Sequence, residues 1–161
     1  MKTPRLRAGA RLPTLAWPSS GTVRLVPLVI RLALVATVAE SGYVHAKLYV
    51  EGYRLIPHIG PMFLLQAAAS FALAVLLLPG PIVVQLAAAA TTLGALGGFV
   101  LSRTVGIWGV TERGFQPHPD ALLSVLSEVA TLGLLTALWL DTLRHRAAGD
   151  ADSAAVTPAR M

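Results

Sequence analysis

The chain has 161 residues, of which 55% are hydrophobic and 13% are charged, and its formal net charge is +5. A soluble domain carries charges on roughly a quarter of its residues, so this composition indicates a membrane protein. The absence of cysteine excludes disulfides, thiol catalysis and cysteine-ligated metals or iron–sulfur clusters. Because the positive charge gathers mainly toward the two ends of the chain, it does not indicate nucleic-acid binding.

Four apolar segments follow one another along the chain, each near the roughly 20 residues that cross a hydrocarbon core as a helix. They cover residues 27–48, 59–78, 82–102 and 121–143. Helices are favoured over strands because a helix satisfies its own backbone hydrogen bonds in lipid. The sequence "PGP" at 79–81 predicts a tight turn between the second and third segments. The predicted fold is therefore an all-α bundle of four transmembrane helices.

The flanking regions set the predicted domain limits and the orientation in the bilayer. We expect a tail at 1–22, a membrane domain at 23–146 and a disordered tail at 147–161. Nine of the Lys and Arg residues lie on the side of the two termini, and four lie on the other side. The positive-inside rule then places both termini in the cytoplasm and segments 49–58 and 103–120 outside. The predicted location is the cell membrane, of the bacterial inner-membrane type.

Two carboxylates fall inside the predicted spans. Glu40 lies roughly 13 Å below the outer end of the first span and Glu128 roughly 10 Å below that of the fourth, at 1.5 Å per residue. Glu128 shares a polar stripe at helical spacing with Ser124, Ser127 and Thr131. A carboxylate facing lipid is costly, so both stripes are expected to turn inward, and an interior carboxylate is a functional-site hypothesis.

Two basic residues are predicted to join these carboxylates in a polar pocket. Arg103 ends the third span, and Lys47 follows Glu40 by two helical turns. In this hypothesis the two Glu residues carry the charge, while Arg103 sets their pKa or holds an anionic group. The structural alternative is that Glu40 pairs with Lys47 or Arg103 only to hold helices together, and that Glu128 is protonated and bonded to a nearby hydroxyl.

Two histidines are candidate ligands for a cofactor. His45 lies about one turn below the outer interface, and His58 begins the second span across a short loop. Two facing His residues can ligate a b-type haem, and a His with carboxylates can bind a divalent metal. The alternative for His45 is an ordinary hydrogen bond at a helix boundary, and the position of His58 at the rim argues against haem.

Helix packing is predicted at one pair of glycines in the third span. Gly94 and Gly98 are four residues apart, the spacing that lets two helix backbones approach closely in a membrane. The alternative is that such spacings arise by chance in helices rich in alanine.

Two stretches carry a resemblance to a family. "GYRLIPHIGPMFLLQA" at 52–67 and "GGFVLSRTVGIWG" at 97–109 resemble small, uncharacterised four-span integral membrane proteins of the actinobacterial type, over about residues 25–145. This resemblance implies the four-span fold and carries no activity with it. The stretch "RLALVATVAESGYVHAK" at 31–47 has a fainter resemblance to DoxX-like membrane proteins. The GYR-x-I-P segment departs from that pattern, so no residues are transferred.

These patterns favour a small integral membrane protein with an outward-facing polar pocket that binds or conducts a proton, a cation, a metal or a small polar ligand. One alternative is an accessory subunit of a larger membrane complex, with other membrane subunits or a second copy as partners. Another is a quinone- or haem-linked membrane oxidoreductase. The chain has no G-x-S-x-G, no glycine-rich phosphate loop and no HExxH. A non-catalytic role is favoured, but the absence of these motifs does not exclude an enzyme, because small membrane enzymes can work from isolated Glu, His and Arg residues.

Overall fold

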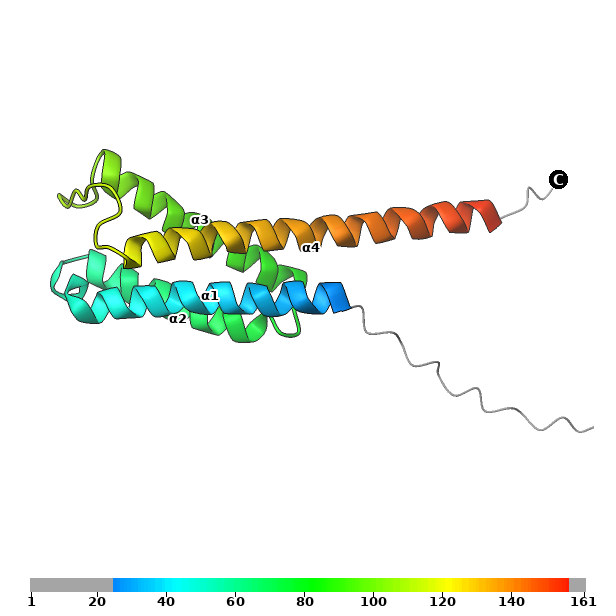
Figure 1. Cartoon of the computed structure of the whole chain (residues 1–161), viewed down its shortest axis with the longest axis horizontal. Coiled ribbons are helices and arrows are strands. Elements are labelled where there is room, and N and C mark those ends of the chain that lie inside the picture. The colour runs from blue at the N-terminus through cyan, green and yellow to red at the C-terminus, as the bar shows by residue number, and fades with distance from the viewer. Residues whose placement is uncertain (1–24, 157–161) are drawn as a thin grey trace, which may run out of the picture.

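The computed structural model describes residues 25–156, and this part of the chain is helical without strands. Its long helices are α1 (Leu25–Glu51), α2 (Ile59–Leu76), α3 (Ile82–Thr104) and α4 (Asp120–Val156), with a short 3-10 turn η1 (Tyr53–Leu55) after α1 (Figure 1). All four long helices have the length and apolar composition needed to cross a membrane. The predicted all-α fold with four candidate spans is therefore confirmed.

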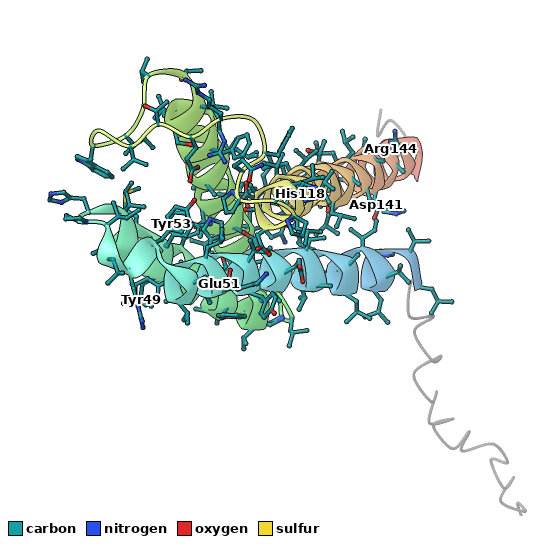
Figure 2. The ribbon with its side chains drawn as sticks, turned by 60° about the vertical axis from the view of Figure 1, so that its left-hand side comes forward. Tyr49, Glu51, Tyr53, His118, Asp141 and Arg144 are labelled. Atoms are coloured by element: carbon teal, nitrogen blue, oxygen red, sulfur yellow. The ribbon has the colours of Figure 1, made fainter. Side chains whose placement is uncertain are left out.

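Helix α1 lies at the centre of the contacts, packing against both α2 and α4, whereas α3 makes fewer contacts with its neighbours. Figure 1 shows α3 running obliquely, so that its end near residue 104 stands away from α1 and α2. Figure 2 shows the same divergence after a rotation. The bundle is thus closed at the end of the α2–α3 turn and more open at the other end.

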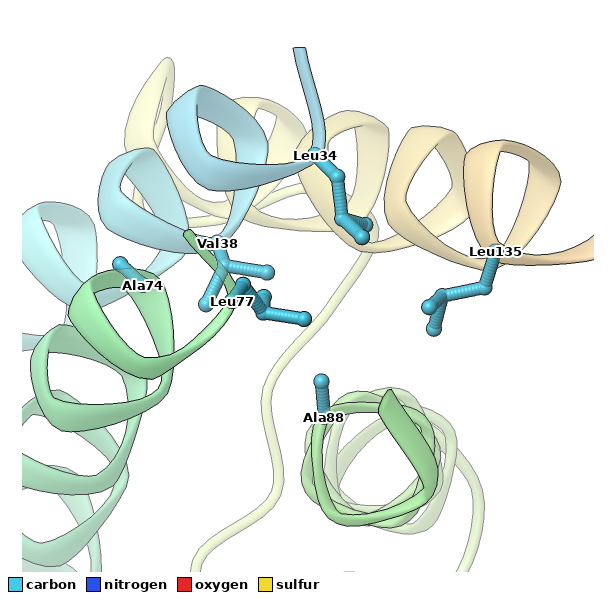
Figure 3. Packing of buried hydrophobic residues seen from close by; sticks show 6 residues of the cluster. All are labelled: Leu34, Val38, Ala74, Leu77, Ala88 and Leu135. Atoms are coloured by element: carbon cyan, nitrogen blue, oxygen red, sulfur yellow. The ribbon is translucent and has the colours of Figure 1, made fainter. Parts of the chain in front are cut away.

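The closed end contains the buried apolar cluster. Each of the four long helices contributes to this cluster, which consists of six residues (Figure 3): Leu34, Val38, Ala74, Leu77, Ala88 and Leu135. In lipid such a cluster holds helices by close van der Waals packing, because lipid tails already solvate apolar side chains. The cluster therefore fixes the base of α3 and leaves its far end free to diverge.

Hydrogen bonds tie the α2–α3 turn into the same end. The Arg31 guanidinium donates from Nη1 to the carbonyl of Pro79 at 3.1 Å, and the Gln85 amide donates to the carbonyl of Gly80 at 2.7 Å. The Trp139 indole donates to Oε1 of Gln85 at 2.7 Å, which links α4 to α3. Gly80 has a positive φ of 62°, a conformation that favours glycine, so the predicted tight turn is confirmed.

The closest helix approach lies between α1 and α2, not on α3. A Cβ built on Gly42 would lie 3.0 Å from Cβ of Ser70, which is itself buried. A Cβ built on Gly94 or Gly98 would meet nothing within 4 Å. The predicted close contact at these two α3 glycines is therefore wrong within this chain, because α3 diverges from its neighbours where they lie.

The C-terminal limit of the helical part also differs from the prediction. Helix α4 continues through Val156, so residues 147–156 are helical rather than disordered. Their alanines are strong helix formers and extend a helix already started in the bundle. Residues 157–161 and the predicted tail at 1–22 lie outside the described residues.

Candidate functional site

A cavity of about 480 Å³ lies between α2 and α3, at the diverging end of the bundle. Its α3 wall begins with the small residues Thr91, Gly94, Ala95 and Gly98 and continues with Phe99, Ser102 and Arg103. Its α2 wall is mainly apolar and includes Met62, Phe63, Leu65 and Ala69. The space exists because α3 presents little side-chain volume where it leaves the bundle, so the two α3 glycines line a cavity instead of a helix contact.

Polar groups gather where the cavity meets the loop that follows α3. Nη1 of Arg103 lies 2.6 Å from Oε2 of Glu112, and the Tyr53 hydroxyl donates to the same carboxylate at Oε1. Nε of Arg103 donates to the carbonyl of Gly114 at 3.0 Å, and Nη2 donates to that of Gln116. These bonds fold the 105–119 loop over this end of the cavity and neutralise the charges of both partners.

The electrostatics of Tyr53 follow from this arrangement. Burial of the phenol, and then its hydrogen bond to Glu112, raise the pKa of Tyr53 above its usual value. The ring also stacks on Phe63, with a centroid separation of 4.5 Å. Tyr53 is therefore an uncharged donor at neutral pH, held between α2 and the loop.

His45 lines the cavity from α1. Its Nδ1 lies 2.8 Å from the backbone carbonyl of Ser41, and its ring is tilted against Phe63 at 5.3 Å. This hydrogen bond lies inside α1, which continues to Glu51, so His45 is bonded within the helix and not at its boundary as the alternative expected. His45 and Arg103 are the two predicted pocket residues with side chains that line this cavity.

Glu128 lies inside the bundle, as its stripe predicts, and is 2% exposed. Its Oε1 accepts from the Ser124 hydroxyl at 2.9 Å and from the Ser41 hydroxyl of α1 at 3.4 Å. Further along the same face, Thr131 bonds Thr37 of α1 at 2.8 Å. Glu128 thus belongs to a row of hydroxyl contacts between α1 and α4, and it connects with the cavity through Ser124, which lines it.

Glu40 lies on the exposed side of α1, and no hydrogen bond or ion pair of its side chain occurs within residues 25–156. Its neighbour Ser41 faces α4, and adjacent residues on a helix project about 100° apart. The expected meeting of Glu40 and Glu128 is therefore wrong. Sequence periodicity gives the angle between two side chains but does not show which of them faces the partner helix.

The two basic residues also find other partners. Nζ of Lys47 lies 2.8 Å from the carboxylate of Asp120, at the start of α4, and 3.8 Å from Glu51. Arg103 pairs with Glu112 of the following loop. The pairing of Glu40 with Lys47 or Arg103 that the structural alternative expected is therefore absent within residues 25–156, and neither basic residue pairs with Glu128.

The two predicted cofactor ligands do not face each other. His58 is exposed, has a positive φ of 65° and lies against Trp108 at 5.5 Å between ring centroids, whereas His45 contacts Phe63. In the part of the chain that the structure describes, no cluster of three His, Cys, Asp or Glu residues could hold a metal ion. Within residues 25–156, the arrangement of His45 and His58 does not fit a metal or haem held between these two histidines.

Sequence reasoning missed Glu112 and Tyr53. Glu112 carried a weak signal, because it is an acidic residue in the loop directly after Arg103. Tyr53 gave no such signal, because an aromatic residue directly after a span is usual at a membrane interface. The contact between Tyr53 and Glu112 depends on how the 105–119 loop folds back over the bundle. Helical periodicity in the sequence does not predict the conformation of a loop.

The fold and the cavity define a small helical protein of the multi-pass membrane class. Its cavity is mainly apolar, and the charges of Arg103 and Glu112 at one end of the cavity neutralise each other. No family model, curated protein or solved structure matches the chain.

Proposed function

We propose that this protein binds an amphipathic small molecule in the cavity between α2 and α3. The observation that carries the proposal is the cavity itself, whose walls are mainly apolar, with Gln66 and Thr91 among them, and whose charged groups Arg103 and Glu112 lie at one end. Its volume of about 480 Å³ falls in the range of roughly 300–1,000 Å³ that is usual for small-molecule sites. The apolar part of the ligand lies along α2 and α3, and its polar part lies toward Tyr53 and Arg103.

This proposal changes the ligand expected from the sequence. A bare cation site needs an unpaired carboxylate facing the pocket, but Glu112 is paired with Arg103 and Asp120 with Lys47. Neither Glu40 nor Glu128 lines the cavity. An apolar wall with few polar groups suits a molecule that partitions into membranes better than an ion.

We place the protein in a bacterial inner membrane with both termini in the cytoplasm. The support is the excess of Lys and Arg on the side of the termini. In this orientation the loop that covers the cavity faces outward, and the ligand enters from the outer leaflet or through the gap between α2 and α3.

The test is mass spectrometry of small molecules extracted from protein purified in lipid nanodiscs. Gly98→Leu places a large side chain in the open space on the α3 wall, and Gly97→Leu is the matched control because Gly97 does not line the cavity and also has nothing near its Cβ. The wild type and Gly97→Leu should retain the same molecule near one equivalent, and Gly98→Leu should lose it. Identical extracts that contain only bulk lipid in all three would contradict the proposal.

A further inference from the structure

The ring nitrogens of His45 have different surroundings. Nδ1 lies 2.8 Å from the carbonyl oxygen of Ser41, and a carbonyl can only accept, so Nδ1 carries the hydrogen. In a neutral imidazole with its hydrogen on Nδ1, Nε2 is an acceptor. No partner for Nε2 is present within residues 25–156, and none of the unpartnered side-chain nitrogens there is fully enclosed. Nε2 is therefore an open acceptor on a ring that lines the cavity.

The charged groups at the loop end of the cavity, Arg103 and Glu112, are already paired with each other. The Arg103 guanidinium binds Glu112, the hydroxyl of Ser102 and the carbonyls of Gly114 and Gln116. Its face also lies 3.9 Å from the ring centroid of Phe99. A carboxylate or phosphate head would have to displace Glu112, and a cationic head would meet a carboxylate that Arg103 neutralises. The cavity therefore favours an uncharged ligand.

From this geometry we infer that the ligand is an uncharged, lipid-like alcohol or phenol whose hydroxyl donates a hydrogen bond to Nε2 of His45. The inference rests on the proposed function and names the class of ligand. The fixed Nδ1–H gives the selectivity: a hydroxyl satisfies Nε2, whereas an ether or hydrocarbon of the same shape leaves this acceptor unpaired. The aromatic row of His45, Phe63 and Tyr53 lies beside the head group and suits a flat phenolic ring.

The experiment compares nonylphenol, its methyl ether and a fatty acid of similar length. Equilibrium binding is measured to wild type, His45→Phe and Gly98→Leu in nanodiscs, with protein-free nanodiscs as the blank. We expect nonylphenol to bind the wild type about tenfold more tightly than the methyl ether does, a ratio that one buried hydrogen bond supports. In His45→Phe the ratio should fall to about one, and in Gly98→Leu neither compound should bind.

The outcomes separate the two proposals. Equal binding of phenol and ether to the wild type, abolished by Gly98→Leu, overturns the hydroxyl inference and leaves the binding function standing. Tightest binding by the fatty acid also overturns the inference. Saturable binding by none of the three compounds overturns both proposals.

A second measurement covers the case in which His45→Phe does not fold. In wild-type protein with ¹⁵N-labelled histidine, nonylphenol should shift the Nε2 resonance of His45, while the methyl ether should leave it near its ligand-free position. An Nε2 shift that is the same for both compounds would overturn the inference without any substitution.

Discussion

Nζ of Lys47 lies 2.8 Å from both carboxylate oxygens of Asp120, which joins α1 to the first residue of α4. The carboxylate also sits at the positive end of the α4 dipole, where a negative charge is favourable. Glu51 lies 3.8 Å from the same ammonium group but is about half exposed. Asp120 should therefore contribute more than Glu51 to the stability of the folded protein.

Asp120→Asn should lower the unfolding temperature in detergent more than Glu51→Gln does. The first change removes a 2.8 Å contact to an Asp120 side chain that is 10% exposed, whereas the second removes a longer contact to a Glu51 side chain that is 53% exposed and screened by solvent. The measurement is a thermal unfolding curve for each single variant and for Lys47→Met/Asp120→Asn. An equal, small effect of the two single changes would show that the Lys47–Asp120 pair is no more than a surface contact.

The sequence was sufficient to predict the four helices but not the side-chain contacts between them. The apolar segments predicted α1 to α4 because bilayer thickness fixes the length of an apolar helix. The stripe at Glu128 predicted its burial, because adjacent hydroxyls and a carboxyl at helical spacing avoid lipid together. The exposure of Glu40 and the pairing of Arg103 with Glu112 depend on helix rotation and on the fold of a loop, which local periodicity leaves open.

Gly42→Ala should destabilise the bundle by about 1–3 kcal/mol, the usual cost of overpacking a close contact. The added Cβ would meet Cβ of Ser70 at 3.0 Å, and α1 and α2 would have to move apart. Gly133→Ala is the control, because a Cβ there meets nothing within 4 Å and alanine favours the helix by up to about 1 kcal/mol. The free energy of unfolding in mixed micelles measures both changes, and a Gly42→Ala protein as stable as Gly133→Ala would contradict this packing.

Glu128→Gln should leave stability nearly unchanged, and Glu128→Leu should reduce it by roughly 1 kcal/mol. Glutamine keeps an oxygen that accepts from Ser124 and Ser41, whereas leucine leaves both hydroxyls without this acceptor. The same unfolding measurement tests the pair. A large loss with glutamine would mean that the negative charge of Glu128 is required, contrary to a carboxyl that is buried with no cationic partner within residues 25–156.

Tyr53 should ionise above the usual phenol value of about 10, because burial and then its bond to Glu112 raise its pKa. The stabilisation from the neutral, buried phenol is complete below about pH 10 and is lost as the pH rises toward the pKa of the folded state, since the unfolded chain ionises first. The difference in phenolate absorbance between wild type and Tyr53→Phe reports this ionisation. In Glu112→Gln the midpoint should move down, and a midpoint near 10 in both backgrounds would contradict the site geometry.

The most direct test of ligand binding is the fluorescence of Trp108, which lines the cavity, during titration with a brominated nonylphenol. Bromine quenches tryptophan only at short range, so a bound probe should quench Trp108 in a saturable way. Saturable quenching is expected in wild type and Gly97→Leu, and its loss is expected in both Trp108→Phe and Gly98→Leu. Quenching that rises linearly with probe in the lipid, equally in Gly97→Leu and Gly98→Leu, would show that the cavity holds no specific ligand.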